Sequence, residues 1–493
     1  MHRKVLGLTG DIPILKKIRY CLGSAGDELP YALFYTYFMM YLTEVAGINA
    51  VAAGIISAIA AACDGLIDPA LGNFSDNLNR KLGTRQKGMV MGLGPLAIVT
   101  ILLFVPAPFA GVGMYIYYGV FSIMFVAFYS LYSMNFVAMG AEMTNSYEER
   151  NMLRMICGLM APFFAWCGHG GPQLVQHIFD GMNLKQQWFS TGFSITLIYA
   201  ICCTICIFVA LSPKKVKELK AKGEFHQIIE ETTADDSSVG GFWQNLKEVL
   251  KVKALRAEII MILGFSTANG FFYALIAYVL TYSMDLSAGQ QALYWAIEGV
   301  IYYVAVVICV PLANIFGKKP IFVVCYGMAG IIMILFVFLP ITNIVAAIAI
   351  MAAFTCIEAP FWTLYCTWGY EISDIDEFAS GKRRTTLILS VASVFIKVGP
   401  TLSYIFTGII LKSIGYVEGG VSQAASVGTG LHIYITLLPG LLLLLGLLGA
   451  ILYPVTLKSY ESLKKNMEAR KANEEYNTEG FEFLLPNYYE EKK

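Results

Sequence analysis

The chain alternates between long apolar runs and shorter polar breaks. A membrane-spanning helix needs roughly 20 mainly apolar residues, and twelve apolar runs come close to or exceed that length. The first, second and eighth carry acidic residues within the run. The pattern predicts an all-α polytopic membrane protein with twelve spans, at residues 20–43, 48–72, 88–106, 112–140, 155–178, 189–212, 257–283, 289–314, 320–339, 342–370, 385–411 and 431–454.

The positive charges are shared unevenly between the two sides of these spans. Of 35 Lys and Arg residues, 32 fall on the side of the N-terminus, Lys185 and Lys412 fall on the other side, and Lys397 lies within a span. Because Lys and Arg concentrate in cytoplasmic loops, we expect a multi-pass protein of the plasma (inner) membrane with both termini cytoplasmic. The first apolar run is too long and, with Asp27 and Glu28, too polar for a cleaved signal peptide.

The polar breaks also divide the chain into four parts. We expect a six-helix half at 1–212, a cytoplasmic middle linker at 213–256, a second six-helix half at 257–454 and a cytoplasmic tail at 455–493. The linker opens with a basic run and ends in an amphipathic segment, FWQNLKEVLKVKAL, which should lie along the inner membrane surface. A regulatory linker and a plain basic connection both fit. The tail is charged, and we expect it to be helical at first and then disordered.

Short sequences recur at matching places in the two halves. GAEMTN closes the fourth predicted span and GYEISD the tenth, while PALGNF closes the second and PLANIF the eighth. Together they favour a duplicated six-helix unit. Two parallel six-helix halves are the major facilitator architecture, in which substrate binds near the midplane between pseudo-symmetric halves. An inverted-repeat arrangement of twelve helices is the alternative.

Composition excludes several classes of protein. Hydrophobic residues make up 57% of the 493 positions and charged residues 14%, where soluble domains have about 25% charged. The net charge is zero, so no nucleic-acid partner is expected. No phosphate-binding glycine loop, zinc HExxH or serine elbow is present, which predicts a transporter without enzyme activity, catalytic residue, cofactor or structural metal. His169 and His177 are interpreted as packed polar residues, and a channel is the remaining rival to a carrier.

Several ionisable residues lie at predicted membrane depth, where each costs roughly 2.5–3.5 kcal/mol. Asp64 and Asp68 are four residues apart and share one helical face. Such carboxylates can bind a hard cation such as sodium or carry a proton. A static ion network is the alternative, above all for Glu298 and Glu358. The full set is Asp27, Glu28, Asp64, Asp68, Glu298, Glu358 and Lys397.

Motifs spread over nearly the whole chain resemble one transporter family. DGLIDPALG from Asp64, YLTEVAGI after the first span, YSLYS in the fourth, FWTL in the tenth, EISDIDEFASGKRR after it and FIKVG around Lys397 are similar to the glycoside-pentoside-hexuronide:cation symporters, the group that includes the melibiose permease. The resemblance implies the major facilitator fold and cation-coupled import of a sugar or glycoside. It also implies three partners, namely a small-molecule substrate, a monovalent cation (H⁺ or Na⁺) and the lipid bilayer. We expect a monomer.

The resemblance also assigns roles to single residues. It implies a cation site at Asp64, Asp68 and Ser130. The loop after the second span, with Asp76, Arg80 and Arg85, resembles a cytoplasmic gate in which Asp76 pairs across the face when the carrier faces outward. The residues implied to bind substrate are Asp27, Glu28, Tyr129, Ser133, Trp362 and Lys397.

The chain departs from the melibiose carrier at three positions. Ile67 stands where that carrier has an asparagine beside the cation, Ser133 replaces a sugar-binding aspartate, and Cys157 or a neighbour replaces a sugar-binding arginine. The loss of an oxygen ligand at Ile67 favours a proton slightly over sodium. A less charged, more aromatic site leaves open a non-sugar amphiphile as substrate, since sodium-dependent lysolipid carriers are distant relatives with this fold.

Overall fold

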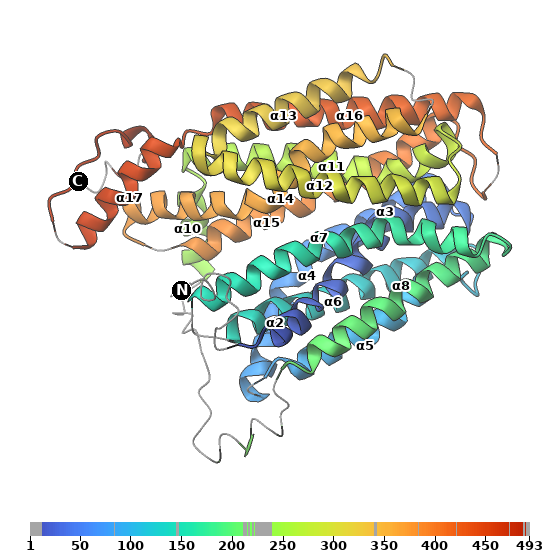
Figure 1. Ribbon diagram of the computed structural model, residues 1–493, viewed down its shortest axis with the longest axis horizontal. Helices are drawn as coiled ribbons and strands as arrows, with labels where there is room; N and C mark the ends of the chain where they lie inside the picture. Colours follow the sequence, from blue (N-terminus) through green and yellow to red (C-terminus); the bar gives the residue numbers. More distant parts are fainter. Residues whose placement is uncertain are drawn as a thin grey trace. The chain divides into compact units, whose positions relative to one another are not determined.

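The computed structural model describes residues 12–82, 84–143, 147–210, 214, 217–218, 221, 239–339, 343–382, 384–420, 422–472, 474–486 and 489. Within these residues, each of the twelve predicted spans corresponds to one long helix (Figure 1). They are α3 (Ser24–Glu44), α4 (Ala50–Leu82), α5 (Gln86–Leu103), α6 (Val112–Glu142), α7 (Tyr147–Ile178), α8 (Leu184–Ile207), α11 (Lys253–Tyr278), α12 (Ala288–Phe316), α13 (Lys318–Leu335), α14 (Ile344–Ser380), α15 (Thr385–Ser413) and α16 (Ala425–Leu452).

Shorter elements flank the long helices. A helix α2 (Ile14–Cys21) precedes them, α10 (Val239–Val249) lies in the predicted linker, and α17 (Leu457–Lys471) follows α16. The π-helical turn η1 (Val279–Ser283) continues α11, and a 3₁₀ turn η2 (Glu482–Leu484) lies in the tail. The all-α fold class predicted from the sequence is confirmed.

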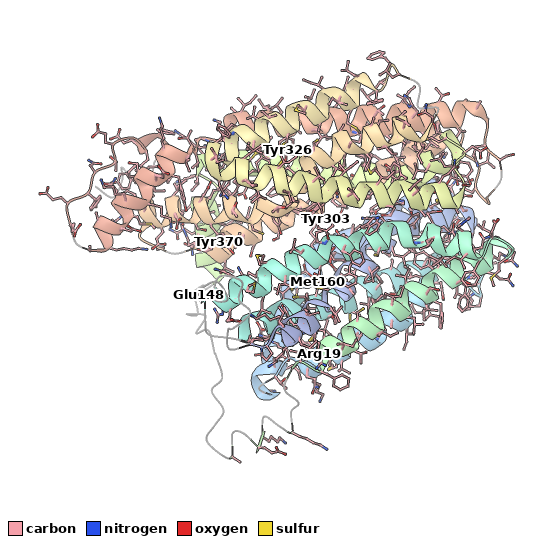
Figure 2. The ribbon with its side chains drawn as sticks, in the orientation of Figure 1. Arg19, Glu148, Met160, Tyr303, Tyr326 and Tyr370 are labelled. Carbon is pink, nitrogen blue, oxygen red and sulfur yellow. The ribbon has the colours of Figure 1, made fainter. Side chains whose placement is uncertain are left out.

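The apolar character of the long helices fits a lipid environment. In the described part of the chain, ten helices are long and apolar enough to cross a membrane, and α3 and α7 are the other two long helices. Large apolar side chains such as Leu66, Ile98 and Val307 are exposed along them, and Figure 2 shows how densely side chains project from the helices. Since lipid is as apolar as these side chains, exposure costs nothing there.

The helices form two compact units that do not coincide with the predicted halves. Unit 1 comprises residues 1–230, 273–299 and 404–428, so it joins α3–α8 to the end of α11, η1, the start of α12 and the end of α15. Unit 2 comprises residues 231–272, 300–403 and 429–493. The boundaries of the halves expected from the sequence stay a prediction.

Two helices are longer than the spans predicted for them, and one expectation about the tail is corrected. Helices α4 and α14 continue to Leu82 and Ser380, beyond the spans expected to end at 72 and 370, because hydropathy marks only the lipid-facing length of a helix. The tail beyond α17 is folded rather than disordered over residues 474–486. Its Phe481 and Leu484 are fully buried, and burial of such side chains offsets the entropy of ordering the backbone.

Close helix packing fixes α6, the helix that carries three predicted site residues. Gly88 and Gly92 lie one turn apart on α5, against α6. A Cβ atom would lie 2.6 Å from Asn135 Oδ1 at Gly88 and 2.7 Å from the Tyr132 backbone nitrogen at Gly92. Only glycine permits this approach, so α5 holds the segment around Ser130 in a defined position.

Candidate cation and substrate site

Asp64 lies where helices α3, α4 and α6 of unit 1 meet. Its side chain is buried, with 1% of the residue surface exposed. Ser130 Oγ donates a hydrogen bond to Asp64 Oδ1 at 3.2 Å, and Tyr35 Oη donates to Oδ2 at 3.5 Å. The structure therefore brings together Asp64 and Ser130, two of the three residues predicted to bind the cation, with an oxygen of each in direct contact.

Asp68 follows Asp64 by one helical turn on the same face of α4 and is half-buried. Asp68 stays a predicted cation ligand. Within the described residues, no group of three or more His, Cys, Asp or Glu side chains has the arrangement to hold a metal ion.

An aromatic surface adjoins Asp64. The Tyr31 ring lies 4.1 Å from that of Tyr35 and 5.5 Å from that of Tyr129, measured between ring centroids. Sequence reasoning identified Tyr129 but missed Tyr31 and Tyr35. The signal was present, because Asp27, Tyr31 and Tyr35 repeat at intervals of four and therefore share one face of α3.

Two further carboxylates lie on α3, the helix that carries Tyr31 and Tyr35. Asp27 and Glu28 are half-buried neighbours on α3 that interact electrostatically with each other. Both also interact electrostatically with Tyr129, as does Asp64. The predicted substrate residues of α3 and α6 thus belong to one cluster with the predicted cation residue Asp64.

Ser133 and Cys157 lie near the same cluster. The resemblance implies that Ser133, and Cys157 or a neighbour, stand where the melibiose carrier has charged sugar-binding residues. Ser133 is half-buried on α6, one turn from Tyr129. Cys157 on α7 interacts electrostatically with Asp27, and its thiol donates to Cys21 Sγ at 2.9 Å. Thiol and hydroxyl groups occupy these positions, where the resembling carriers have charged ones.

The remaining predicted substrate residues lie in unit 2. Trp362 on α14 is half-buried and meets Phe265, Phe361 and Tyr365 edge-on at centroid distances of 5.5–5.8 Å. Lys397 is half-buried on α15. Two residues further on, a Cβ atom on Gly399 would lie 2.3 Å from Ser266 Oγ of α11, so α15 is tightly held there.

The two buried glutamates of uncertain role are in different units. Glu298 belongs to unit 1 and Glu358 to unit 2, and each is 5% exposed. Beside Glu298, a Cβ atom on Gly299 would lie 2.9 Å from the Trp166 ring of α7. Both stay candidates for coupling or for structural support.

The predicted gate residues form a local contact in unit 1. Arg85 Nη1 pairs with Asp76 Oδ1 at 2.8 Å, with the Asp76 side chain 62% exposed. The side chain of Arg80 lies outside the described residues. Pairing of Asp76 across the membrane face in another conformation stays a prediction.

Comparison with known proteins gives the chain a family. A family model described as MFS/sugar transport protein matches residues 19–457. The chain belongs to this family. The membership agrees with the resemblance drawn from the helix motifs, and it places the chain among the polytopic membrane transporters of the major facilitator superfamily.

Similar curated proteins are symporters and carriers that match over nearly their full length. The uncharacterized symporter YnaJ of Bacillus subtilis is 23% identical, covering 93% of this chain and 96% of its own. The glucuronide carrier protein homolog of Escherichia coli is 23% identical (92% and 95%). The sodium-dependent lysophosphatidylcholine symporter 1 of Xenopus tropicalis is also 23% identical (96% and 93%).

Solved structures show the same fold. The inward open conformation of the xylose transporter XylE from E. coli superposes with a TM-score of 0.60 at 16% identity, covering 94% of this chain and all of that one. A bacterial homolog of the human lysosomal transporter Spinster gives a TM-score of 0.62 at 12% identity (90% and 97%). The major facilitator fold is therefore established, and the family's symporters imply a coupling ion.

Proposed function

We propose that this protein is a cation-coupled symporter that imports a sugar or glycoside by alternating access. The observation that carries the proposal is the cluster in unit 1. There the Asp64 carboxylate contacts the Ser130 hydroxyl beside the adjacent rings of Tyr31, Tyr35 and Tyr129. Aromatic rings bind the apolar faces of sugars, and carboxylates accept hydrogen bonds from sugar hydroxyls.

Coupling follows from charge neutralisation at this cluster. The cation binds at Asp64, Asp68 and Ser130, and the α3 carboxylates and Lys397 then engage the substrate. The two halves rock around the loaded site and release both solutes into the cytoplasm, where both termini lie. One charge moving through 100 mV provides about 2.3 kcal/mol, enough for roughly tenfold or greater accumulation.

The coupling ion is proposed to be a proton. A hard metal cation needs several oxygen ligands at once, and Ile67 offers none beside Asp68. A proton needs only one carboxylate, and the presence of three carboxylates in unit 1, Asp27, Glu28 and Asp64, supports this choice. Sodium is the alternative, with Ser130 and backbone carbonyls completing its ligand shell.

A second substrate class is favoured by one comparison. Lysophosphatidylcholine symporters of Xenopus tropicalis and Danio rerio match this chain over 92–93% of their length. A bulky amphiphile would use the aromatic surface for its chain and the carboxylates for a cationic head group. The fold and the family are the same for both substrate classes, so an uptake experiment has to separate them.

The test is uptake into proteoliposomes that contain the purified chain. Labelled glycosides, pentosides and lysophosphatidylcholine are each offered at fixed pH with sodium replaced by choline, and again after a proton-gradient jump without sodium. We expect a glycoside or pentoside to accumulate with the proton gradient. Accumulation of lysophosphatidylcholine alone would overturn the substrate proposal, and sodium stimulation without a response to the pH jump would overturn the ion proposal.

A further inference from the structure

The chain after α16 is attached to the last turns of α14, within unit 2. Helix α17 begins with a capping box, in which the side chains of Thr456 and Ser459 accept hydrogen bonds from each other's backbone nitrogens at 3.3 and 2.9 Å. One turn on, Tyr460 Oη donates to Asp374 Oδ2 at 2.6 Å, and Lys464 Nζ pairs with the same oxygen at 2.8 Å. Two side chains of α17 thus converge on one carboxylate of α14.

The hydrogen bond from the Tyr460 hydroxyl to Asp374 can form at all physiological pH values. Burial, followed by the hydrogen bond to Asp374, raises the pKa of the Tyr460 hydroxyl above its ordinary value. The hydroxyl therefore stays protonated and keeps donating to the carboxylate. At the end of α17, Lys471 pairs with Glu377 at 2.9 Å, but its side chain is 58% exposed, and such ion pairs contribute little.

The stronger attachment is an aromatic cage around Phe378, which is 1% exposed. The rings of Phe481, Tyr476 and Tyr489 lie 5.2, 5.8 and 6.0 Å from the Phe378 ring. The Arg470 guanidinium lies 5.4 Å from the same ring and donates to the Phe378 carbonyl oxygen. One side chain of α14 is thus enclosed by groups from α17 and from the segment beyond it.

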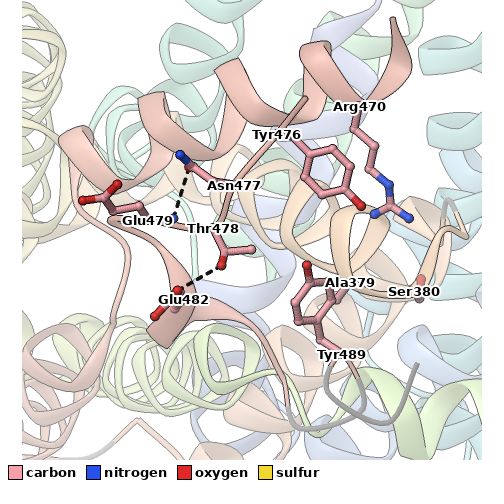
Figure 3. A pocket seen from close by; sticks show the side chains of 9 residues that line it. All are labelled: Ala379, Ser380, Arg470, Tyr476, Asn477, Thr478, Glu479, Glu482 and Tyr489. Atoms are coloured by element: carbon pink, nitrogen blue, oxygen red, sulfur yellow. Dashed lines mark hydrogen bonds between the residues drawn. The ribbon is translucent and has the colours of Figure 1, made fainter. Parts of the chain in front are cut away.

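The segment after α17 has its own internal order. Thr478 Oγ1 donates to Glu482 Oε1 at 3.0 Å, and the Glu479 backbone nitrogen donates to Asn477 Oδ1 at 3.3 Å (Figure 3). These bonds turn the chain back so that Phe481 and Leu484 point inward, both fully buried, while Phe483 between them is 51% exposed. The alternation shows that this segment presents one face to the protein.

An open pocket of about 800 Å³ lies between the tail and the end of α14. Figure 3 shows side chains of the tail and of the end of α14 lining it. The lining includes Ala379, Ser380, Arg470, Tyr476, Glu482 and Tyr489. A segment attached at a few points can detach without unfolding the helices that it joins.

We propose that the tail from α17 to Tyr489 is a strap that holds the last turns of α14 in place, with Phe378 as its anchor. Helix α14 also carries Glu358, more than five turns from the anchor, and Trp362, more than four turns from it. A rigid helix tethered at one end moves only as far as the tether allows. The strap would therefore set how readily α14 changes position, and this effect on transport rests on the proposed function.

The strap is tested without any substrate by hydrogen exchange of the purified full-length protein. The two variants compared are Phe481→Ala and Phe483→Ala, which remove the same side chain two residues apart. Phe481→Ala should speed exchange of the 371–380 amides by roughly tenfold, because opening of this segment becomes easier. Phe483→Ala should leave their exchange unchanged. Equal exchange in the two variants would overturn the strap.

Two further measurements keep the proposal falsifiable. If Phe481→Ala fails to fold, Tyr460→Phe, which loses only the hydroxyl that meets Asp374, should still speed exchange at 371–380 by about twofold or more.

In proteoliposomes, Phe481→Ala should lower the maximal uptake rate several-fold with KM unchanged, and Phe481→Leu should restore part of that rate. A raised KM with an unchanged maximal rate would contradict a role in the conformational step. The hydrogen-exchange result tests the strap even if the protein transports no substrate. The strap and the proposed transport function can therefore fail separately.

Discussion

Asp64 in unit 1 and Asp376 near the end of α14 both accept hydrogen bonds, but from different kinds of donor. In unit 1, Asp64 accepts hydrogen bonds from the hydroxyls of Ser130 and Tyr35. In unit 2, Asp376 receives two hydrogen bonds from the Arg384 guanidinium, at 2.9 and 2.6 Å. Hydroxyl donors orient a carboxylate without adding positive charge, whereas a guanidinium both orients and neutralises it. The first arrangement suits exchange of a mobile cation, and the second suits permanent structure.

The largest effect on folding is expected at Asp376, since it is fully buried and Arg384 is 3% exposed. Asp376→Asn removes one of the two carboxylates that pair with the Arg384 guanidinium, and only Glu248 remains. Breaking a buried pair completely costs about 3–5 kcal/mol, and we expect a loss below that range because Glu248 still compensates the charge. The thermal unfolding midpoint of the purified protein should fall by several degrees. Asp374→Asn is the comparison and should have a smaller effect, because its partner Lys464 has a side chain that is 42% exposed and can be solvated by water. An unchanged midpoint for Asp376→Asn would show that this pair is not structural.

A tenfold effect on coupling, without a large loss of stability, is expected at Ser130. Ser130→Ala removes the hydroxyl that contacts Asp64, and a hydrogen bond to a charged group contributes about 1.5–3 kcal/mol. The concentration of coupling cation that gives half-maximal uptake should rise about tenfold or more.

Ser122→Ala is the matched control for that experiment. Ser122 is fully buried on the same helix, and its hydroxyl donates to the Gly119 carbonyl oxygen of its own helix at 2.9 Å. Its loss should leave the cation dependence unchanged. If the two serine variants behave alike, Ser130 acts through helix packing. The proposed difference between Asp64, as a cation site, and Asp376, as a structural pair, would then lose its support.

The smallest effect is expected at the exposed ion pair between Lys471 and Glu377. Lys471→Gln should lower stability by less than about 1 kcal/mol, and the loss should shrink further in high salt. Thermal unfolding at low and at high salt measures the loss of stability and its salt dependence. A large loss at low salt that disappears at high salt would mean that charge, rather than the cage around Phe378, attaches the tail.

Much of the fold and part of the site could be predicted from the sequence. Hydropathy located all twelve long helices because lipid selects directly for runs of apolar residues. The approach of Asp64 to Ser130 was anticipated only through the family resemblance, since no spacing rule links residues on different helices. Tyr31 and Tyr35 were missed, although their spacing from Asp27 placed them on the same helix face.

Other features could not be read from one sequence. Arg384 counted as a cytoplasmic positive charge, yet the structure buries it against Asp376 and Glu248. Its partners depend on how α10 packs against α14, which no local pattern encodes. The tail was misjudged because charge dominates its composition. Disordered segments have few aromatic residues, and Tyr476, Phe481 and Phe483 were the signal that this tail folds.

The most direct test of the account is to compare accumulation and exchange in Asp64→Asn. Asparagine keeps the shape and can still accept the Ser130 hydrogen bond, but it removes the charge that the cation would neutralise. In proteoliposomes with a cation gradient, the variant should lose concentrative uptake while counterflow of labelled substrate continues. If Asp64→Asn still accumulates substrate with the cation dependence of the unmodified protein, Asp64 is not the coupling site.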